Sequence, residues 1–356
     1  MRAKVLAGKF SVYALLLFGS VLMSLPFAWM LSTALKPIEQ TMAMPPQWLP
    51  YRYYAAISGN MEAVVPVERI VGAAYLAEDG TVFRDRLDAG DAPVREFRGT
   101  VDAPLFKVVT ESDRSEWAVV AASEVSRRIE PRWGNFVNAV KAMRYFPRYL
   151  WNTLLLCVLT VVGTVCSSAL AAYGFSRIDW RGRDKVFAVV LGTMMVPFPV
   201  VMVPLYCLFR WFGMIGTLQP LWVGSFFAQA FNVFLLRQFF MGIPKDLSDA
   251  ARIDGCGEFA IFLRIILPAA KPALIVVALL QFLFTWNDFL GPLIYLTDQK
   301  DYTLALGLQF FQSQNGGTEW HYLMAASVLV IAPVMLLFLV AQKSFIEGIS
   351  MTGMKG

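Results

Sequence analysis

The residues best placed to do chemistry lie in a short polar segment, residues 243–268, between two apolar stretches. Pro244 suits the start of a helix, and Gly255 and Gly257 suit its end, because a left-handed C-terminal cap favours a residue without Cβ. A second, amphipathic helix over 259–267 is expected to stop at Pro268. The acid-rich first turn matches the helix dipole. This pattern predicts either a docking surface for a partner protein or a plain connector loop.

Within this segment, residues 249–251 form the surface that a partner protein would contact. Asp249 is charged, whereas Ala250 and Ala251 leave a low face that a groove in a partner could approach closely. The chemistry expected here is therefore binding between proteins and not covalent catalysis.

Catalytic and metal-binding patterns are missing from the sequence. The four cysteines, Cys157, Cys166, Cys207 and Cys256, have no CxxC spacing, and His321 is the only histidine. We therefore predict no metal site and no disulfide framework. No nucleophile with its base and no phosphate-binding Gly-x-x-x-x-Gly-Lys-Ser/Thr segment occurs, so we expect no enzyme activity and no ATP hydrolysis by this chain.

The composition is that of a membrane protein: 57% of residues are hydrophobic and 16% charged, against about 25% charged in soluble domains. Six stretches approach the roughly 20 apolar residues that cross a bilayer. They are residues 10–35, 149–173, 186–209, 221–240, 273–296 and 322–341. The first is longer than a signal-peptide core, so a retained anchor is favoured over a cleaved signal. Pro197, Pro199 and Pro204 are expected to distort the third.

Basic residues predict the orientation of these spans. Fourteen Lys and Arg residues fall in the terminal and loop segments on the side of the N-terminus, and only Arg210 and Lys300 in the short loops opposite. The positive-inside rule therefore places both termini in the cytoplasm. The net charge of +5 follows this topology, so it indicates lipid contact and not nucleic-acid binding.

A long external region, residues 37–148, separates the first span from the core formed by residues 149–356. Asp79-Gly80 lies between short apolar runs and predicts a hairpin turn. Residues 94–101 and 105–110 read as strands, and 116–125 as a strand or short helix. The fold class predicted is an all-α polytopic membrane protein with six transmembrane helices and a small β-rich periplasmic part.

Polar residues inside the apolar stretches are candidates for a transport pathway, because polar groups in a bilayer usually face a cavity or another helix. In the fifth stretch the candidates are Trp286, Asn287, Asp288 and Gln281, and in the fourth they are Gln229 and Asn232. Trp286 could stack on a sugar face. For Asn287 and Asp288, hydrogen bonding between helices is favoured over direct sugar contact.

The 243–268 segment resembles the EAA loop of ATP-binding-cassette importer permeases. Asp249-Ala250-Ala251, Gly255, Ile265 and Leu267-Pro268 fall in register with that pattern, with Asp249 in place of its Glu. The maltose-type carbohydrate branch of these permeases is resembled by residues 286–296 and 301–308, and by residues 133–136 and 151–153 at the entry to the second span. In the tail, 343–356, the resemblance lies at residues 345–349 and 353–356. Residues 1–36 would form the N-terminus and first span, and residues from about 58 to 131 look like an insertion.

The resemblance implies a type I importer fold and a set of partners. The chain would pair with a second permease, a different chain, and bind a dimer of cytoplasmic ATPases that hold ATP and Mg²⁺, so that this chain itself carries no cofactor. Docking would use Asp249, Ala250, Ala251, Asp254, Gly255 and Gly257. A periplasmic or lipoprotein sugar receptor would contact Gln312, Ser313, Gln314, Asn315 and Gly316, and the tail through Lys355 and Gly356 would reach between the ATPases.

Three other functions remain open. Glycerol phosphate or a polyol could replace the sugar as substrate. An ion-coupled secondary carrier would need several buried ionisable residues, and only Asp288 lies well inside a span. A membrane-anchored sensor would use the β-rich region but would not need six spans.

Overall fold

The structure is a computed structural model that describes residues 2–353 except 58, 78–80, 84–85, 87, 89–92, 113–115 and 313–317. The chain divides into two compact units. The first comprises Met1–Ala139 with Gly316–Val328, and the second Val140–Asn315 with Leu329–Gly356.

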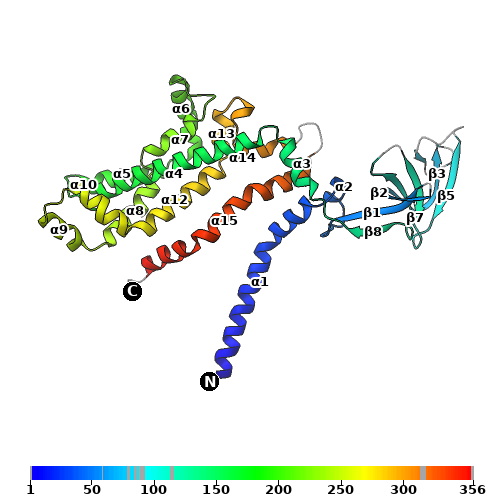
Figure 1. The fold of residues 1–356 in the computed structure, drawn as a ribbon, viewed down its shortest axis with the longest axis horizontal. Helices are drawn as coiled ribbons and strands as arrows, with labels where there is room; N and C mark the ends of the chain where they lie inside the picture. Colours follow the sequence, from blue (N-terminus) through cyan, green and yellow to red (C-terminus); the bar gives the residue numbers. More distant parts are fainter. Residues whose placement is uncertain are drawn as a thin grey trace. The chain divides into compact units, whose positions relative to one another are not determined.

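The first unit begins with α1 (Arg2–Ala34), a long helix whose apolar part, Val12–Ala34, is largely uncovered within the chain and becomes buried only at its end, at Thr33 and Ala34 (Figure 1). Large apolar side chains such as Leu15, Leu17 and Phe18 are exposed along it. So much exposed apolar surface requires lipid or another protein around it.

In the described residues, eight strands come after α1 and form two antiparallel sheets. The five-stranded sheet has the order β7-β6-β2-β1-β8 and the three-stranded sheet the order β4-β3-β5. The strands are β1 (Tyr51–Ile57), β2 (Asn60–Ile70), β3 (Gly72–Ala77), β4 (Val82–Phe83), β5 (Val94–Gly99), β6 (Leu105–Thr110), β7 (Trp117–Ala121) and β8 (Ser126–Ile129). The five-stranded sheet packs a small core of Ala55, Ile57, Val64, Val108 and Val120.

Four features of the strands agree with the predictions from the sequence, and the β-rich part begins earlier in the chain than predicted. β5 and β6 lie where strands were predicted, and 117–121 is a strand and not a helix. Tyr75 and Leu76 pair with Phe83 and Val82 around the expected hairpin, whose turn at Asp79-Gly80 lies outside the described residues. The β-rich part begins at Tyr51, ahead of residue 58, because β1 pairs with both β2 and β8.

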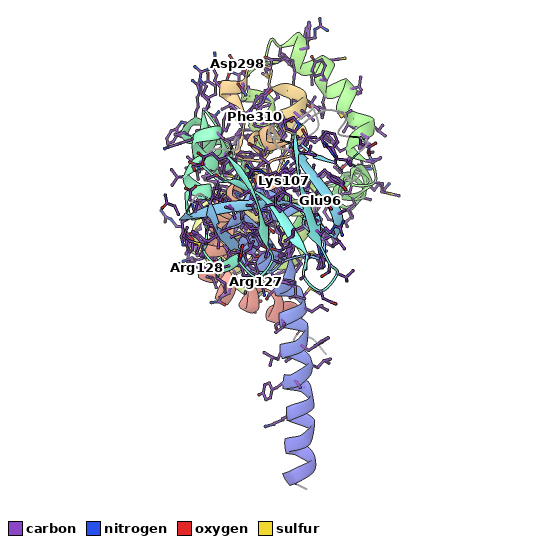
Figure 2. The ribbon with its side chains drawn as sticks, turned by 90° about the vertical axis from the view of Figure 1, so that its right-hand side faces the viewer. Glu96, Lys107, Arg127, Arg128, Asp298 and Phe310 are labelled. Atoms are coloured by element: carbon purple, nitrogen blue, oxygen red, sulfur yellow. The ribbon has the colours of Figure 1, made fainter. Side chains whose placement is uncertain are left out.

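The edge strand β8 is short and charged. All four of its residues are exposed, and Arg127 and Arg128 carry guanidinium groups beside Tyr51 and Tyr54 of β1 (Figure 2). A short edge strand with charged side chains resists pairing with other strands, which protects the sheet from aggregation.

Gly99 lies where the two sheets meet, and its substitution gives a first prediction. A Cβ on Gly99 would lie 2.3 Å from the Ile70 carbonyl oxygen and 3.1 Å from the Leu105 nitrogen, both backbone atoms that cannot move aside. We expect Gly99→Ala to lower the free energy of unfolding of this region by about 1–3 kcal/mol. Limited proteolysis of the purified protein should show faster cleavage within residues 51–129.

The matched control for Gly99 is Gly134→Ala. Gly134 starts α3 (Gly134–Ala142), and a Cβ there meets nothing within 4 Å. This control should be cut at the wild-type rate. Equal protease resistance of Gly99→Ala and the wild type would show that the sheets relax around the added methyl group.

The end of α1 is tied to α3 within the same unit. The Asn135 side-chain amide donates to the carbonyls of Ala34 (2.8 Å) and Lys36 (2.9 Å), and the Arg132 backbone nitrogen donates to Leu35 (3.0 Å). These bonds satisfy carbonyl groups that the end of a helix leaves without partners. The residues at 132–135 therefore fix where the chain returns from the β-rich part to α1.

The second unit is helical, and its centre is α4 (Phe146–Ser176), which packs against α8 (Ala230–Gly242) and α12 (Lys271–Trp286) (Figure 1). The core includes Ala172, Leu236, Phe240 and Val277. The remaining helices of the chain are α2 (Ile38–Thr41), α5 (Arg183–Thr193), α6 (Phe198–Trp211), α7 (Gln219–Val223), α9 (Lys245–Ile253), α10 (Glu258–Ile261), α11 (Leu267–Ala269), α13 (Leu290–Tyr295), α14 (Leu304–Gly307) and α15 (Trp320–Gly353).

Three described helices are long and apolar enough to cross a membrane unbroken: Val12–Ala34, Phe146–Ser176 and Trp320–Gln342. Three further candidates are helix pairs bent by 74–95° at a short break, which would bring the number to six if each pair is one span. The sharpest bend, 95°, separates α5 from α6 at Pro197, so the predicted distortion of the third stretch is confirmed.

Candidate functional site

The 243–268 loop folds as two helical pieces separated by a tight turn. Pro244 precedes α9, as predicted, with an extended ψ of 135°. The second piece runs through α10, a π-helical turn at Phe262–Ile266 and α11. This piece ends at Ala269, one residue beyond Pro268, so the expected stop at this proline is confirmed to within a residue.

Gly255 makes the turn between the two pieces. Its φ of +81° lies in the left-handed region, and the nitrogens of Gly255 and Cys256 donate to the carbonyls of Arg252 (3.0 Å) and Ala251 (2.9 Å). The predicted glycine cap is therefore confirmed at Gly255. It is wrong at Gly257, whose φ of −73° is open to any residue and which precedes α10.

The small residues of α9 do not all face outward. Ser248 and Ala251 are buried, and Ala251 belongs to the core of the second unit, whereas Asp249 and Ala250 are exposed. The open face expected at Ala251 is therefore wrong, because its methyl group packs inside this chain. Small side chains at these places let α9 lie close against the core.

The surface that α9 and α10 expose is partly apolar. Ile253 is 87% exposed and Phe259 66%, and Leu247 is also exposed. Exposed side chains of this size at the tip of a polar loop are typical of a contact surface for another protein. Sequence reasoning missed them, because a Leu or Ile in a short helix looks the same whether it faces inward or outward.

Asp249 is already paired within the loop. Its Oδ1 lies 2.6 Å from Arg252 Nη1, and Arg252 Nε lies 2.8 Å from Glu258 Oε1. The other oxygen of Glu258, Oε2, accepts from the Tyr173 hydroxyl at 2.6 Å. The hydrogen bonds from Arg252 and Tyr173 hold the pKa of Glu258 below its usual range. The Glu258 carboxylate therefore stays charged at neutral pH, and its bonds to Arg252 and Tyr173 weaken only in acid.

A cavity of about 520 Å³ lies within the second unit and has both aromatic and polar walls. Its polar lining residues include Gln229, Gln281, Thr285 and Asp288, and its aromatic ones Phe198, Phe209, Phe284 and Tyr295. Three of the six predicted pathway residues, Gln229, Gln281 and Asp288, thus line one cavity, although they come from separate apolar stretches.

A row of hydrogen-bonding side chains follows one wall of this cavity. Gln281 Nε2 donates to Thr285 Oγ1 at 3.1 Å, and Thr285 Oγ1 lies 2.9 Å from Thr160 Oγ1 of α4. The two threonines were not predicted, because a single hydroxyl in an apolar helix usually bonds its own backbone and gives no signal.

The other three candidates lie elsewhere. Trp286 is buried and donates from Nε1 to the Val330 carbonyl (3.1 Å) in α15, so its ring is not free for a sugar. Asn287 is exposed and donates to the Leu283 carbonyl at 2.8 Å. Asn232 donates to Gln229 Oε1 at 3.0 Å and is buried behind it.

Asn287 and Asp288 mark a break in the fifth apolar stretch. α12 ends at Trp286 and α13 begins at Leu290, and Asp288 Oδ1 accepts from the Gly291 nitrogen at 3.0 Å. Both side chains therefore satisfy backbone groups at a helix end, instead of joining neighbouring helices as expected. Asp288 also faces the cavity, so it has a second possible role there.

The predicted receptor contacts are mostly outside the described residues. Gln312 follows a helical turn at Leu308–Phe311, but 313–316 are not described. The same holds for Lys355 and Gly356 of the tail. The contacts expected at these residues stay predictions.

Comparison with known proteins identifies the class of this chain. Residues 141–350 match the family of binding-protein-dependent transport system inner membrane components, and the chain belongs to that family. It is a multi-pass protein of the inner membrane. The predicted membership of the chain in the binding-protein-dependent permeases is thereby confirmed.

Individual relatives of the chain belong to transport systems for particular saccharides. The chain is 40% identical over 212 residues to the arabinooligosaccharides transport system permease protein AraQ of Bacillus subtilis, covering 60% of this chain and 74% of AraQ. It is 34% identical over 213 residues to the trehalose/maltose transport system permease protein MalG of Thermococcus litoralis, covering 60% and 77%. A solved bacterial transporter for the import of alginate shares the fold, with a TM-score of 0.55 and 23% identity over 60% of this chain and 80% of that one.

Proposed function

We propose that this chain is the transmembrane subunit of an ATP-binding-cassette importer that takes up a saccharide. The named relatives AraQ and MalG serve arabinooligosaccharides and trehalose or maltose, and others serve lactose and diacetylchitobiose. The observation that carries the substrate class is the cavity wall formed by Gln281 and Thr285, beside Phe284 and Tyr295, with Thr160 bonded behind Thr285. Hydroxyl and amide groups suit sugar hydroxyls, and aromatic faces suit the apolar faces of sugar rings.

The charge of the cavity favours an uncharged saccharide over glycerol phosphate. Among the described residues that line it, Asp288 is the one ionisable carboxylate, and none is Lys, Arg or His. A phosphate group is normally bound by cationic side chains or helix N-termini. A phosphorylated polyol would find no cationic side chain among these residues and would lie near the carboxylate of Asp288.

The 243–268 loop is the proposed docking site for a cytoplasmic ATPase dimer that holds ATP and Mg²⁺. Exposed Asp249, Ala250, Ile253 and Phe259 support this function, since they surround the turn at Gly255. Asp254, Gly257 and the Ala251 backbone complete the surface. Ala251 would act by letting α9 seat on the core and not by touching the partner.

In the proposed topology the chain crosses the membrane six times, with the loop and both termini in the cytoplasm and the β-rich part in the periplasm as an insertion. The excess of basic residues in the segments on the side of the N-terminus supports this orientation. The bare apolar surface of α1 supports a second permease as partner, a different chain. A sugar receptor is supported by a solved alginate transporter in complex with a periplasmic protein, to which the chain is 17% identical with a TM-score of 0.50.

The first test is to identify what copurifies with the chain. We expect an N-terminally tagged chain, extracted in mild detergent from native membranes, to bring an ATP-binding-cassette ATPase and a second multi-span permease, both identified by mass spectrometry. An untagged strain controls for nonspecific proteins. A chain that emerges alone would rule out the importer and favour a connector loop.

A further inference from the structure

The docking helix α9 is held on both sides by the last two turns of one other helix, α4. Before α9, the Arg177 guanidinium donates to the carbonyls of Phe240 and, at 2.5 Å, Ile243, where α8 ends. After α9, the Tyr173 hydroxyl donates to Glu258 at the start of α10. Tyr173 and Arg177 are four residues apart, so they lie on one face of α4. Figure 1 shows α9 and α10 gathered at this end of α4.

The bonds at Glu258 reach back to α9 itself. Arg252, in the last turn of α9, joins Glu258 to Asp249, so α9, α10 and α4 share one network. The Tyr173 ring is also buried and packs on Phe262 with 5.0 Å between centroids. A hydrogen bond to a charged group in such a place is stronger than one between neutral groups.

The same helix reaches the cavity at its other half. Thr160 of α4 bonds Thr285 in the cavity wall, and Leu156 lines the cavity. Thr160 and Tyr173 are separated by 13 residues of unbroken helix, or about 20 Å. A stiff helix fixed at both places transmits a displacement of α9 to the cavity wall.

We infer that Tyr173 and Glu258 are positioning residues that make α9 and α4 move as one body, and so couple ATP hydrolysis to the opening of the cavity. This inference rests on the proposed importer function. The Tyr173 hydroxyl bonds a residue outside α4, so α4 itself does not need this hydroxyl in order to form. Arg177 fixes the other side of α9, which prevents the loop from pivoting about Tyr173.

The test measures saccharide transported per ATP hydrolysed, in proteoliposomes that contain the whole importer and its loaded receptor. Tyr173→Phe removes the hydroxyl and keeps the ring on Phe262, and Glu258→Gln keeps the shape and removes the charge. We expect each to lower the ratio by about threefold or more. The double variant should be no worse than the poorer single one, since both remove the same link.

Ser176→Ala is the matched control. The Ser176 hydroxyl lies in the same turns of α4 but bonds only the Tyr173 carbonyl of its own helix. It should keep the wild-type ratio. Loss of local stability would lower assembly and both rates together without changing the ratio, so the ratio separates coupling from stability.

An unchanged ratio in both single variants, with a working wild type, would overturn the inference and leave the importer function standing. Additive losses in the double variant would also overturn it. A wild-type complex without ATP-driven saccharide uptake would overturn both the function and the inference. If Tyr173→Phe does not assemble, the ratio of Glu258→Gln decides by the same rule.

Discussion

Replacing Gly255 with Asp should reduce ATP-driven uptake at least tenfold while the chain still inserts into the membrane. Two effects add at this position. The φ of +81° costs a residue with a Cβ about 1–2 kcal/mol, though less for Asp and Asn, and the new carboxylate lies in the loop that already holds Asp249, Asp254 and Glu258. A turn that opens changes the angle at which α9 meets the ATPase, and the added charge alters its surface. Uptake into right-side-out vesicles and copurification of the ATPase are the measurements.

Two matched variants separate these effects. Gly255→Asn keeps the tolerance for a left-handed backbone and adds no charge. Gly257→Asp adds the same charge two residues away, where φ is ordinary and a Cβ meets nothing within 4 Å. We expect Gly255→Asn to keep most of the uptake and Gly257→Asp to fall between the other two. Normal uptake by Gly255→Asp would remove the loop from the mechanism.

The sequence and the structure agree best where a local rule determines the backbone. Gly255 was expected to cap a helix because the pattern ends there, and its positive φ confirms this. Pro197 was expected to distort a span, and a 95° bend lies beside it. In both places a single residue type restricts its own φ and ψ, so no distant contact is needed.

Predictions failed where distant contacts decide. β2 was not predicted, because Pro66 interrupts its apolar pattern; the strand exists since it pairs with β1 and β6 and shifts register beside Pro66. Ala251 looked like a surface residue and is buried, because α9 folds back on the core. No local pattern reports which face of a nine-residue helix meets a core 80 residues away along the chain.

The candidate pathway residues also divide into those whose role a local pattern predicts and those whose role it does not. Polarity within an apolar stretch correctly selected Gln229, Gln281 and Asp288 for the cavity. It could not exclude Asn287, which is polar for a local reason: α12 ends beside it and leaves carbonyl groups that its side chain satisfies. Polarity alone therefore identifies the polar residues within apolar stretches. The structure is needed to say whether each of them faces a cavity or lies at a helix end.

Replacing Gln281 with Leu should weaken saccharide binding in the cavity by about tenfold. Leu has a similar size but no donor, so the bond to Thr285 is lost and the wall presents one polar group fewer to a sugar hydroxyl. A net hydrogen bond contributes about 0.5–1.5 kcal/mol, and Thr285 keeps its other bond, to Thr160. Calorimetry in detergent, on the transporter without its receptor, measures the dissociation constant of the saccharide for the cavity alone.

The control is Gln299→Leu, which replaces an exposed glutamine outside the cavity and should bind the saccharide as the wild type does. Equal affinity in Gln281→Leu and the control would mean that the saccharide does not contact this wall, and that the pathway runs along other residues.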